Sequence, residues 1–399
     1  MVLVEKTIMT RGLKDIKLAL FFSAGVGLDV WAANGMLDRE LALYKALSAC
    51  LAEVDFITYG GVGDLKYADH VKEINLFANP WIRRPHKLEK YLLTLNSAIV
   101  QARQHKLFKN VDVLKTNQIS GSEVAVSVKK KFGKKLIVRC GYVPSRLMNI
   151  ASGHSISMAN LGNPRSIYVA EKSAFANADV VIVPTENDKK WVMEVYKTEN
   201  CKIRVLPNYV ETERFKEQPY VEKKYDIVIV ARNSHEKNIP SIIDALKYLK
   251  SEGIDLSVIF VGSSGMSDVV QKNKELFNIT TAGNVESKDM PFIYSSSKIF
   301  LIASFYEGNS KVLLEAMSCG LPCIGTDVDS INTIITHRKT GYLCRTDGVA
   351  IANAIKDVIR DEHLQKAMGQ NARRLAIDRF SIEGIIKAEL DIIGEVAQK

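Results

Sequence analysis

Two glutamates, Glu307 and Glu315, are separated by seven residues in a segment that follows a predicted strand at 298–303. Glu307 lies in the turn after this strand, and a helix is predicted to begin directly afterwards, through Gly308, Asn309 and Ser310. Backbone NH groups at the start of a helix lack partners within it and can bind a phosphate group. At ~3.6 residues per turn, Glu315 lies about two turns further along, near the same face. The two carboxylates are therefore placed to accept hydrogen bonds from sugar or ribose hydroxyls.

Each glutamate taken alone also has a simpler interpretation. A carboxylate at a helix start is stabilised by the helix dipole, and a Glu further along a helix is usually solvated.

The familiar phosphate-binding loops are absent, and the turn that contains Gly25 and Gly27 lacks the third glycine of a dinucleotide fingerprint, which disfavours an NAD enzyme. These two glycines either let the backbone approach donor phosphates or an acceptor, or form a plain tight turn.

The wider segment Glu-Gly-x-x-x-Val-Leu-Leu-Glu-Ala-Met-x-x-Gly-x-Pro resembles the retaining nucleotide-sugar glycosyltransferases of the GT-B fold, specifically the family 4 group. A second segment, Ala231 to Asn238, is similar to the place where family members hold an Arg and a Lys against the donor pyrophosphate. Segments 178–185, 205–210 and 258–262 also match the family in type. The resemblance covers most of the chain and is strongest in its second half.

The resemblance implies a role for each matching residue. Arg232 and Lys237 would neutralise the diphosphate, Glu307 would contact the donor sugar, and Glu315 would hold the ribose. The residue chemistry agrees, because an Arg fork and a mobile Lys charge together stabilise a departing diphosphate. Either cation alone is equally well explained as an exposed surface charge. We expect a nucleotide-diphosphate sugar as co-substrate and no metal or other cofactor. The other residues of the expected donor site are Gly25, Gly27, Gly308, Asn309 and Ser310.

The first half of the chain departs from the family pattern. Family members often carry a His after the strand that corresponds to 136–139, whereas this chain has Arg139-Cys-Gly-Tyr142. His154 lies further along in a Gly/Ser-rich loop, where a lone His is more often only a polar loop residue. Arg139 and Tyr142 are therefore candidates for the acceptor side. Arg39, near the start of a predicted helix, is a third candidate, with an ordinary surface ion pair as the alternative.

Two other motifs need comparison with metal sites. Asp327-Val-Asp329 has the Asp-x-Asp form with which glycosyltransferases of a different fold hold a divalent metal. Capping of a helix before Ile331 explains this motif without a metal. Cys319 and Cys323 have no His or further Cys nearby, so they fall short of a zinc site.

The elements that must position these residues follow one pattern. Short β-branched runs alternate with longer helical patterns, which predicts an α/β fold of parallel sheets with helices on both faces. The first series has predicted strands at 16–22, 54–58, 111–115, 136–139, 180–183 and 202–207. A charged stretch without an apolar period, 211–224, indicates a domain boundary. The second series has predicted strands at 225–231, 256–261, 298–303 and 322–325.

These series predict two doubly wound Rossmann-like domains that face a central crevice, which is the GT-B architecture implied by the resemblance. We expect an acceptor-side domain at 1–215 and a donor domain at 216–380. The segment 381–399 has apolar residues at helical spacing and is expected to form a helix that can pack back on the first domain. The site is expected in the crevice, at the carboxyl ends of the strands.

The composition bounds the class of protein. The 399 residues are 47% hydrophobic, include six cysteines and carry a formal net charge of +9. This excludes a disordered chain and a disulfide scaffold, and the scattered cysteines fit a reducing compartment. The sequence has no apolar run of the ~18 to 20 residues that a membrane span requires, and 17–25 fails as a signal peptide because Asp15 precedes it. We expect a cytoplasmic protein with anionic partners but not nucleic acid, for which the sequence has no recognised binding motif.

Two basic segments, 129–135 and 81–87, remain. The second pairs Trp81 with cations, as a contact with a membrane surface would, although a solvated helix end is the alternative. Because acceptors in the family it resembles are often lipid-linked, we expect a glycan, lipid-linked or small-molecule acceptor and a peripheral membrane contact. The expected function is a retaining, metal-independent glycosyltransferase. Two alternatives stay open: a nucleotide-sugar epimerase of the same fold, and a non-catalytic nucleotide-binding subunit, which the missing His would suit.

Overall fold

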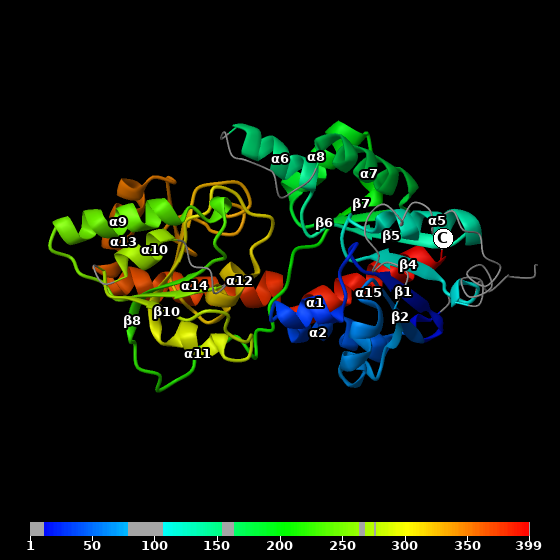
Figure 1. Ribbon diagram of the computed structural model, residues 1–399, viewed down its shortest axis with the longest axis horizontal. Helices are drawn as coiled ribbons and strands as arrows, with labels where there is room; N and C mark the ends of the chain where they lie inside the picture. The colour runs from blue at the N-terminus through cyan, green and yellow to red at the C-terminus, as the bar shows by residue number, and fades with distance from the viewer. Residues whose placement is uncertain (1–11, 79–106, 154–162, 263–267, 275–276, 399) are drawn as a thin grey trace, which may run out of the picture.

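The computed structural model describes residues 12–78, 107–153, 163–262, 268–274 and 277–398. Within this part of the chain, each half builds its own parallel sheet with helices packed on it (Figure 1). This arrangement confirms the predicted α/β class with two doubly wound, Rossmann-like domains. Of the helices that the structure describes, none is both long enough and apolar enough to cross a membrane.

The first domain is built on a sheet with the strand order β3-β2-β1-β4-β5-β6-β7. The strands described are β1 (Lys17–Phe21), β2 (Glu53–Thr58), β3 (Asn75–Ala78), β4 (Val113–Thr116), β5 (Lys135–Arg139), β6 (Val180–Val183) and β7 (Ile203–Val205). The helices described with them are α1 (Leu28–Ala33), α2 (Leu37–Cys50), α5 (Ser122–Phe132), α6 (Pro144–Gly153), α7 (Pro164–Asn177) and α8 (Glu186–Tyr196). The strand order reverses between β1 and β4, and such a reversal opens a crevice at the carboxyl ends of the strands.

The second domain repeats this plan with the strand order β10-β9-β8-β11-β12-β13. Its described strands are β8 (Tyr225–Val230), β9 (Val258–Val261), β10 (Ile279–Thr281), β11 (Ser297–Ile302), β12 (Cys323–Thr326) and β13 (Tyr342–Cys344). Its described helices are α9 (Ile239–Ser251), α10 (Asp268–Asn273), α11 (Met290–Ser295), α12 (Lys311–Ser318), α13 (Gly348–Ile359) and α14 (Glu362–Phe380). Here the order reverses between β8 and β11.

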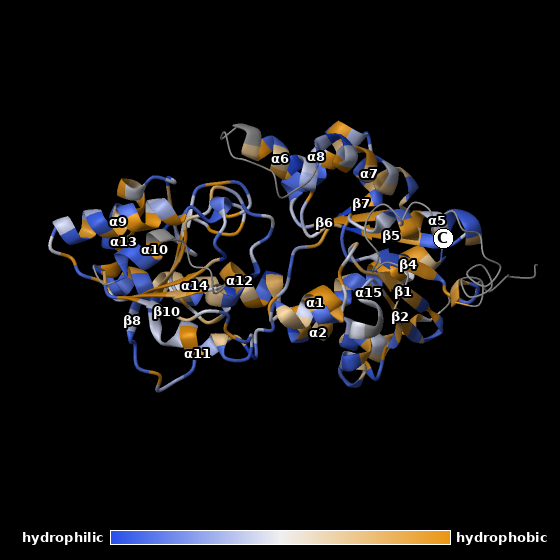
Figure 2. Cartoon of the chain, in the orientation of Figure 1, coloured by the Kyte–Doolittle hydropathy of each residue, from blue (hydrophilic) through white to orange (hydrophobic). Residues whose placement is uncertain are grey.

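Both faces of each sheet are buried, which explains the nearly continuous apolar runs of the strands. In β1, Leu18 and Leu20 contact the core cluster under α2, whereas the alternate residues Ala19 and Phe21 belong to the cluster on the other face. Successive side chains of a strand point to opposite faces, so a strand covered on both sides must be apolar throughout. Figure 2 shows the apolar residues concentrated along the strands of both sheets.

The predicted strands are all present, with ends shifted by up to two residues. Three strands were not predicted: β3, β10 and β13. Each of these lies at an edge of its sheet, and each is short and only partly buried. An edge strand has one unpaired side and needs no long apolar run, so it leaves a weak pattern in the sequence.

The chain crosses between the domains twice, at one place. The first crossing follows β7, and the second joins α14 to α15 (Ile382–Gln398). The two segments pair there, because Val210 donates its NH to the Phe380 carbonyl at 2.8 Å and accepts from the NH of Ile382 at 3.0 Å. Helix α15 then packs on α2, β4 and β5 of the first domain, as the red helix in Figure 1 shows. The C-terminal helix is thus part of the first domain's core.

Candidate active site

The loops after β8 and β11 carry the residues with the strongest chemical signal. These two strands are neighbours at the point where the strand order reverses, so the loops at their carboxyl ends lie side by side. The loop after β8 contains Arg232 and a short 3₁₀ helix, His235–Lys237, and the loop after β11 contains Glu307. The backbone joins the two loops directly, because the NH of Phe305 donates to the Glu236 carbonyl at 2.8 Å.

Lys237 and Glu307 form an ion pair across these loops. The Lys237 Nζ lies 2.5 Å from Glu307 Oε1, and the Ser304 hydroxyl donates to the same oxygen at 2.7 Å. The two side chains are only 14% and 12% exposed, so the pair is largely shielded from water. The structure therefore fixes one cation and one carboxylate at the reversal point of the second sheet.

Arg232 lies close to this pair but is much more open. Its side chain is 79% exposed, and its nearest carboxylate, that of Glu236, is 3.9 Å away. Across the crevice is Tyr142 of the first domain, whose pKa is raised by burial and lowered again by the positive charge of Arg232. The structure thus places Tyr142, expected on the acceptor side, opposite the cation expected to bind phosphate.

Gly308 lies where the two domains touch. A Cβ atom on this residue would lie 3.1 Å from the Cβ of Tyr142 and 3.2 Å from the Gly141 carbonyl oxygen. Both distances are tighter than ordinary carbon contacts, so glycine lets the loop after β11 approach the first domain. The predicted glycine is therefore explained by contact between the domains.

Asn309 and Ser310 connect the site to the interdomain crossing and to α12. The Asn309 side chain accepts the NH of Asn208 at 2.9 Å, and the Asn208 amide donates to the Asn309 carbonyl at 2.6 Å. Ser310 precedes α12, and its side chain makes no capping hydrogen bond to the helix. Ser310 therefore does not occupy the backbone NH groups at the start of α12, and these groups can donate to a ligand. They lie beside the Lys237–Glu307 pair.

Glu315 is buried and engaged by both domains. It is 4% exposed, accepts a hydrogen bond from the Tyr294 hydroxyl at 3.1 Å, and lies 3.5 Å from Arg39 Nη1. Burial raises the pKa of this carboxyl, and the charge of Arg39 opposes that effect. One turn before it on α12, Lys311 pairs with Glu40, the neighbour of Arg39 on α2. Arg39, expected on the acceptor side, instead contacts the carboxylate expected to hold the ribose.

Arg139, expected on the acceptor side, is buried and paired with the C-terminal helix. The residue is 7% exposed, and its guanidinium lies 2.7 Å from the carboxylate of Glu389 on α15. Lys115, at the end of β4, lies 2.9 Å from the other oxygen of the same carboxylate. Buried charges need such partners. Arg139 therefore holds the C-terminal helix against the first sheet, and its expected place on the acceptor side stays a prediction.

The two glycines of the first turn also differ from one another. A Cβ on Gly27 would lie 2.4 Å from Asp64 Oδ1 and 2.5 Å from the Cα of Gly60, so this glycine permits close packing within the domain. Gly25 has a φ of +74°, and a Cβ added to it would meet no atom within 4 Å. Only Gly25 keeps the backbone accessible, as the expected approach to a ligand requires. Gly27 is explained by packing.

The remaining motifs of the sequence have structural partners or lie outside the described residues. Asp329 accepts a hydrogen bond from Asn187 at 2.7 Å, and Asp327 accepts one from Asn332 at 3.0 Å. Cys319 and Cys323 are buried, and burial raises the pKa of both thiols. Lys129 pairs with Asp179. His154 and the segment 81–87 lie outside the part of the chain that the structure describes.

The sequence did not indicate several contacts of the site, among them those of Ser304, Asn208, Tyr294 and Asn187. Asn208 follows Pro207 in segment 205–210, which matches the family in type, so a local signal for it exists. Other contacts join residues from different elements of the fold; Asn187, for example, is 142 residues from its partner. The printed sequence carries no pattern for such contacts.

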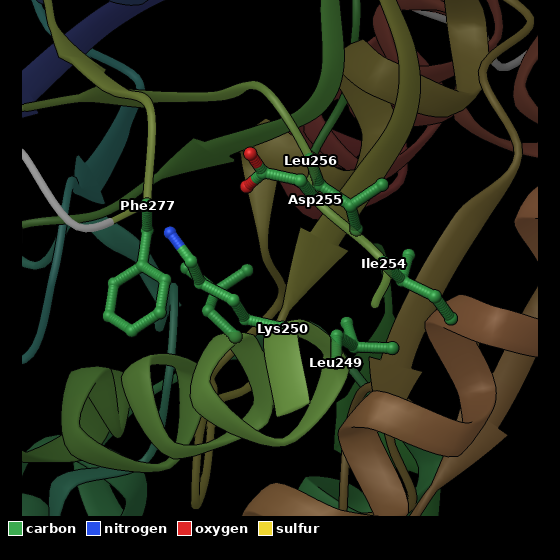
Figure 3. A pocket seen from close by; sticks show the side chains of 7 residues that line it. Leu249, Lys250, Ile254, Asp255, Leu256 and Phe277 are labelled. Atoms are coloured by element: carbon green, nitrogen blue, oxygen red, sulfur yellow. The ribbon is translucent and has the colours of Figure 1, made fainter. Parts of the chain in front are cut away.

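Two concave surfaces lie away from these loops in the described part of the chain. Figure 3 shows a pocket beside α9, lined by Leu249, Lys250, Leu256 and Phe277 among others, with a volume of only about 10 Å³. That is room for about one water molecule. A wider depression of about 590 Å³ lies at the amino ends of β6 and β7, and two of its lining cations, Lys129 and Arg204, are paired with carboxylates.

Two family models match consecutive parts of this chain. The model described as Glycosyltransferase Family 4 matches residues 41–214, and the model described as Glycosyl transferases group 1 matches residues 210–375. The boundary between the two matches coincides with the first crossing between the domains. The second match contains both loops of the site.

Individual relatives are similar to the chain at low identity. The N-acetyl-alpha-D-glucosaminyl L-malate synthase of Bacillus anthracis is 24% identical over 370 residues, which is 88% of this chain and 91% of the relative. The UDP-Gal:alpha-D-GlcNAc-diphosphoundecaprenol alpha-1,3-galactosyltransferase of Escherichia coli is 27% identical over 225 residues, or 51% and 56% of the two chains.

Solved structures share the fold over nearly the whole chain. The sucrose-phosphate synthase of Thermosynechococcus elongatus superposes with a TM-score of 0.77 at 20% identity, covering 95% of this chain and 98% of the other. HepE of Anabaena in complex with UDP superposes with a TM-score of 0.72 at 17% identity, covering 95% and 100%. Together with the two family models, these likenesses show that the chain belongs to the glycosyltransferases of the GT-B fold, with a family 4 domain followed by a group 1 domain.

Proposed function

We propose that this glycosyltransferase transfers a sugar from a nucleoside diphosphate donor to an acceptor, with retention of the anomeric configuration. One observation carries the proposal: the Lys237–Glu307 ion pair lies at the reversal point of the second sheet, beside the start of α12 and against the first domain. A cation, a carboxylate and helix amides gathered in one crevice suit a ligand that combines phosphates with sugar hydroxyls.

The relatives support a donor and an acceptor of this kind. The Anabaena protein was solved with UDP and with UDP-glucose, and the Escherichia coli relative is named for a UDP-sugar and a diphosphoundecaprenol-linked acceptor. On this basis we propose a UDP-sugar donor and a lipid-linked or glycan acceptor, reached at a peripheral contact with a membrane from the cytoplasm. The net charge of +9 suits an acceptor that carries phosphate.

The proposed reaction needs positioning and charge stabilisation more than a protein base. The acceptor hydroxyl oxygen forms a bond to C1 of the sugar as the bond from C1 to the diphosphate oxygen breaks. The acceptor proton passes to the departing diphosphate on the same face, which preserves the configuration. Arg232 and Lys237 offset the charge that develops on the diphosphate, and Glu307 orients the sugar hydroxyls. This route needs no histidine after β5.

Glu315 would bind the ribose by exchanging a partner. Its carboxylate now contacts Arg39 and Tyr294. Ribose hydroxyls can replace the guanidinium as donors, while the Tyr294 hydrogen bond holds the carboxylate in place. Arg39 would then couple the binding of nucleotide to the contact between α2 and α12.

A thermal-shift panel tests the donor site. The panel contains UDP, GDP, ADP and their glucose conjugates, with and without EDTA, on the wild-type protein and on Glu315→Ala. We expect one base series to raise the Tm by several degrees at about 100 times its Kd, because a ligand that binds only the folded state stabilises it. We expect the shift to persist in EDTA and to shrink in the variant.

The other outcomes separate the alternatives. If no nucleotide or nucleotide sugar of the panel raises the Tm, the proposed donor site is contradicted. Tight nucleotide binding without consumption of any nucleotide sugar, with or without a lipid-linked acceptor, favours a non-catalytic subunit. Complete release of free nucleotide in the absence of any acceptor favours the epimerase, for which the relatives described above offer no support.

A further inference from the structure

Asp329, the second carboxylate of the Asp-x-Asp motif, is held by the opposite domain. It lies in the loop after β12 of the second domain, and Asn187 at the start of α8 donates to its Oδ1 at 2.7 Å. Arg146 on α6 forms an ion pair with the same carboxylate. Both partners belong to the first domain. The Asp329 side chain is 25% exposed, whereas that of Arg146 is 9% exposed, so the pair is largely shielded from solvent.

Arg146 is itself fixed within the first domain. Its Nη1 lies 3.1 Å from Asp188 Oδ1, and Asp188 is 2% exposed. The other oxygen of Asp188 accepts from the Thr185 hydroxyl at 2.5 Å. The guanidinium therefore has one nitrogen anchored on its own domain and a second nitrogen on Asp329. A guanidinium anchored in this way offers a fixed point rather than a flexible surface charge.

The residue after Asp329, Ser330, contacts the loop after β11 that contains Glu307. The NH of Ser330 donates to Asp329 Oδ1 at 2.9 Å, and the Ser330 hydroxyl forms a hydrogen bond with the Glu307 carbonyl oxygen. Ser330 is 1% exposed and has a φ of +72°, in the left-handed region that non-glycine residues rarely adopt. Such a conformation persists where its surroundings determine it. Here those surroundings include Asp329 on one side and Glu307 on the other.

A continuous set of contacts thus runs from Arg146 and Asn187 through Asp329 and Ser330 to Glu307. We infer that Asp329 is a positioning residue for Glu307. Asp329 links the contact between the domains to the backbone of the loop after β11, which contains Glu307. The role of Glu307 itself rests on the proposed function; the mechanical link from Asp329 to the loop does not.

Asp327 is the natural control for this inference. It belongs to the same motif and the same loop, but its side chain contacts Asn332, five residues further along the chain. Asp327→Asn removes a carboxylate of equal charge two residues away without touching the contact between the domains. Asp329→Asn keeps the size and a hydrogen-bonding oxygen but removes the charge opposite Arg146. A difference between these two variants therefore reports the interdomain contact.

The first measurement needs no ligand. Hydrogen–deuterium exchange of the full chain follows the amides of residues 304–310 in the wild type, Asp329→Asn, Asp327→Asn and Ser330→Ala. We expect exchange about threefold or more faster in this segment for Asp329→Asn and Ser330→Ala, because local opening becomes easier, and wild-type exchange for Asp327→Asn. Equal exchange in the Asp329 and Asp327 variants overturns the inference.

The second measurement separates positioning from a general loss of structure. Hydrolysis of UDP-glucose is followed in the same four proteins, each with its Tm measured. For Asp329→Asn we expect kcat to fall about tenfold with KM within about twofold of wild type, because a displaced Glu307 affects the transition state more than donor binding. A rise in KM alone, with kcat unchanged, also overturns the inference. A wild-type protein that consumes no UDP-glucose counts against the proposed donor, and the exchange experiment then decides the inference by itself.

Discussion

The two domains repeat one fold but use their charged residues differently. At the reversal point of the second sheet, Lys237 and Glu307 pair across two neighbouring loops, and Arg232 in the first of these loops is largely exposed. At the corresponding carboxyl ends of the first sheet, Lys115 and Arg139 turn to Glu389 on the C-terminal helix and are buried. The same strand topology thus carries the proposed donor site in one domain and the attachment of a helix in the other.

This difference shows why one half of the chain was easier to interpret. A donor with phosphates is recognised by helix amides and nearby cations, and these follow one strand after another in the sequence. The charges of the first domain pair with a helix far later in the chain; Arg139, for example, is 250 residues from its partner Glu389. The comparison therefore predicts that charge changes in the first domain mainly affect stability, and that those in the second mainly affect turnover.

The largest expected effect is on stability, from Glu389→Ala. The substitution leaves Lys115 and Arg139 buried without their shared carboxylate, and breaking such a pair costs about 3–5 kcal/mol of unfolding free energy. The measurement is urea unfolding. Glu395→Ala on the same helix is the control, because its pair with Arg204 is 39% and 33% exposed and such pairs contribute about 0–1 kcal/mol. Equal losses in the two variants would break the comparison.

Lys237→Ala tests the other side of the comparison. Loss of one group that stabilises developing charge typically lowers kcat by about 10²–10³-fold. We expect this fall in UDP-glucose turnover with a smaller loss of unfolding free energy than Glu389→Ala shows, because this pair is partly exposed and Glu307 keeps its hydrogen bond from Ser304. Lys247→Ala, which removes an exposed cation paired with Asp244 on α9, is the matched control and should retain activity. If Lys237→Ala instead lowered the unfolding free energy but the folded protein kept full specific activity, the assignment of the pair to catalysis would be wrong.

Gly308→Ala sharpens the comparison at the point where the domains meet. The added Cβ lies 3.1 Å from Tyr142 and 3.2 Å from the Gly141 carbonyl, and overpacking of this kind costs about 1–3 kcal/mol. Because the clash exists only when the domains are in contact, we expect kcat/KM for UDP-glucose to fall about tenfold or more while the Tm changes little. Gly394→Ala, whose nearest neighbour would be 3.5 Å away, is the control. A large drop in Tm for Gly308→Ala would place its effect within one domain.

The smallest expected effect concerns Asp55 in β2 of the first domain. Burial raises the pKa of this carboxyl to about 6, with the nearby Glu53 adding to the effect and Asn75 opposing it. An acid whose pKa is higher in the folded state than in the unfolded state binds a proton more tightly when folded, so its contribution to stability falls as pH rises from about 4 to about 6. We expect Asp55→Asn to raise the Tm by a few degrees at pH 7.5 and to leave it unchanged at pH 4. A Tm difference that does not depend on pH would contradict this assignment.

The central strands were predictable because their position is recorded locally. A strand buried on both faces is an apolar run, and the runs at 225–231 and 180–183 show this directly. The edge strands β3, β10 and β13 are paired on one side only and partly exposed, so nothing forces their residues to be apolar. Their existence depends on a neighbouring strand to pair with, and the neighbour is chosen by the tertiary structure.

The residues of the proposed site also fall into two groups: those that a short segment of sequence indicates, and those whose partners lie far away in the chain. The spacing of Glu307 and Glu315, the glycine between the domains and the cations after β8 belong to short segments. The sequence by itself therefore determined the fold class and the family, and it suggested the site that we propose in the second domain. The burial of Arg139 against Glu389, the contact of Arg39 with Glu315, and the link from Arg146 to Asp329 join residues between 183 and 276 positions apart. Only the tertiary structure decided these pairs, because the energy of a charge depends on which partner and how much water surround it, and both are set by the packing of distant segments.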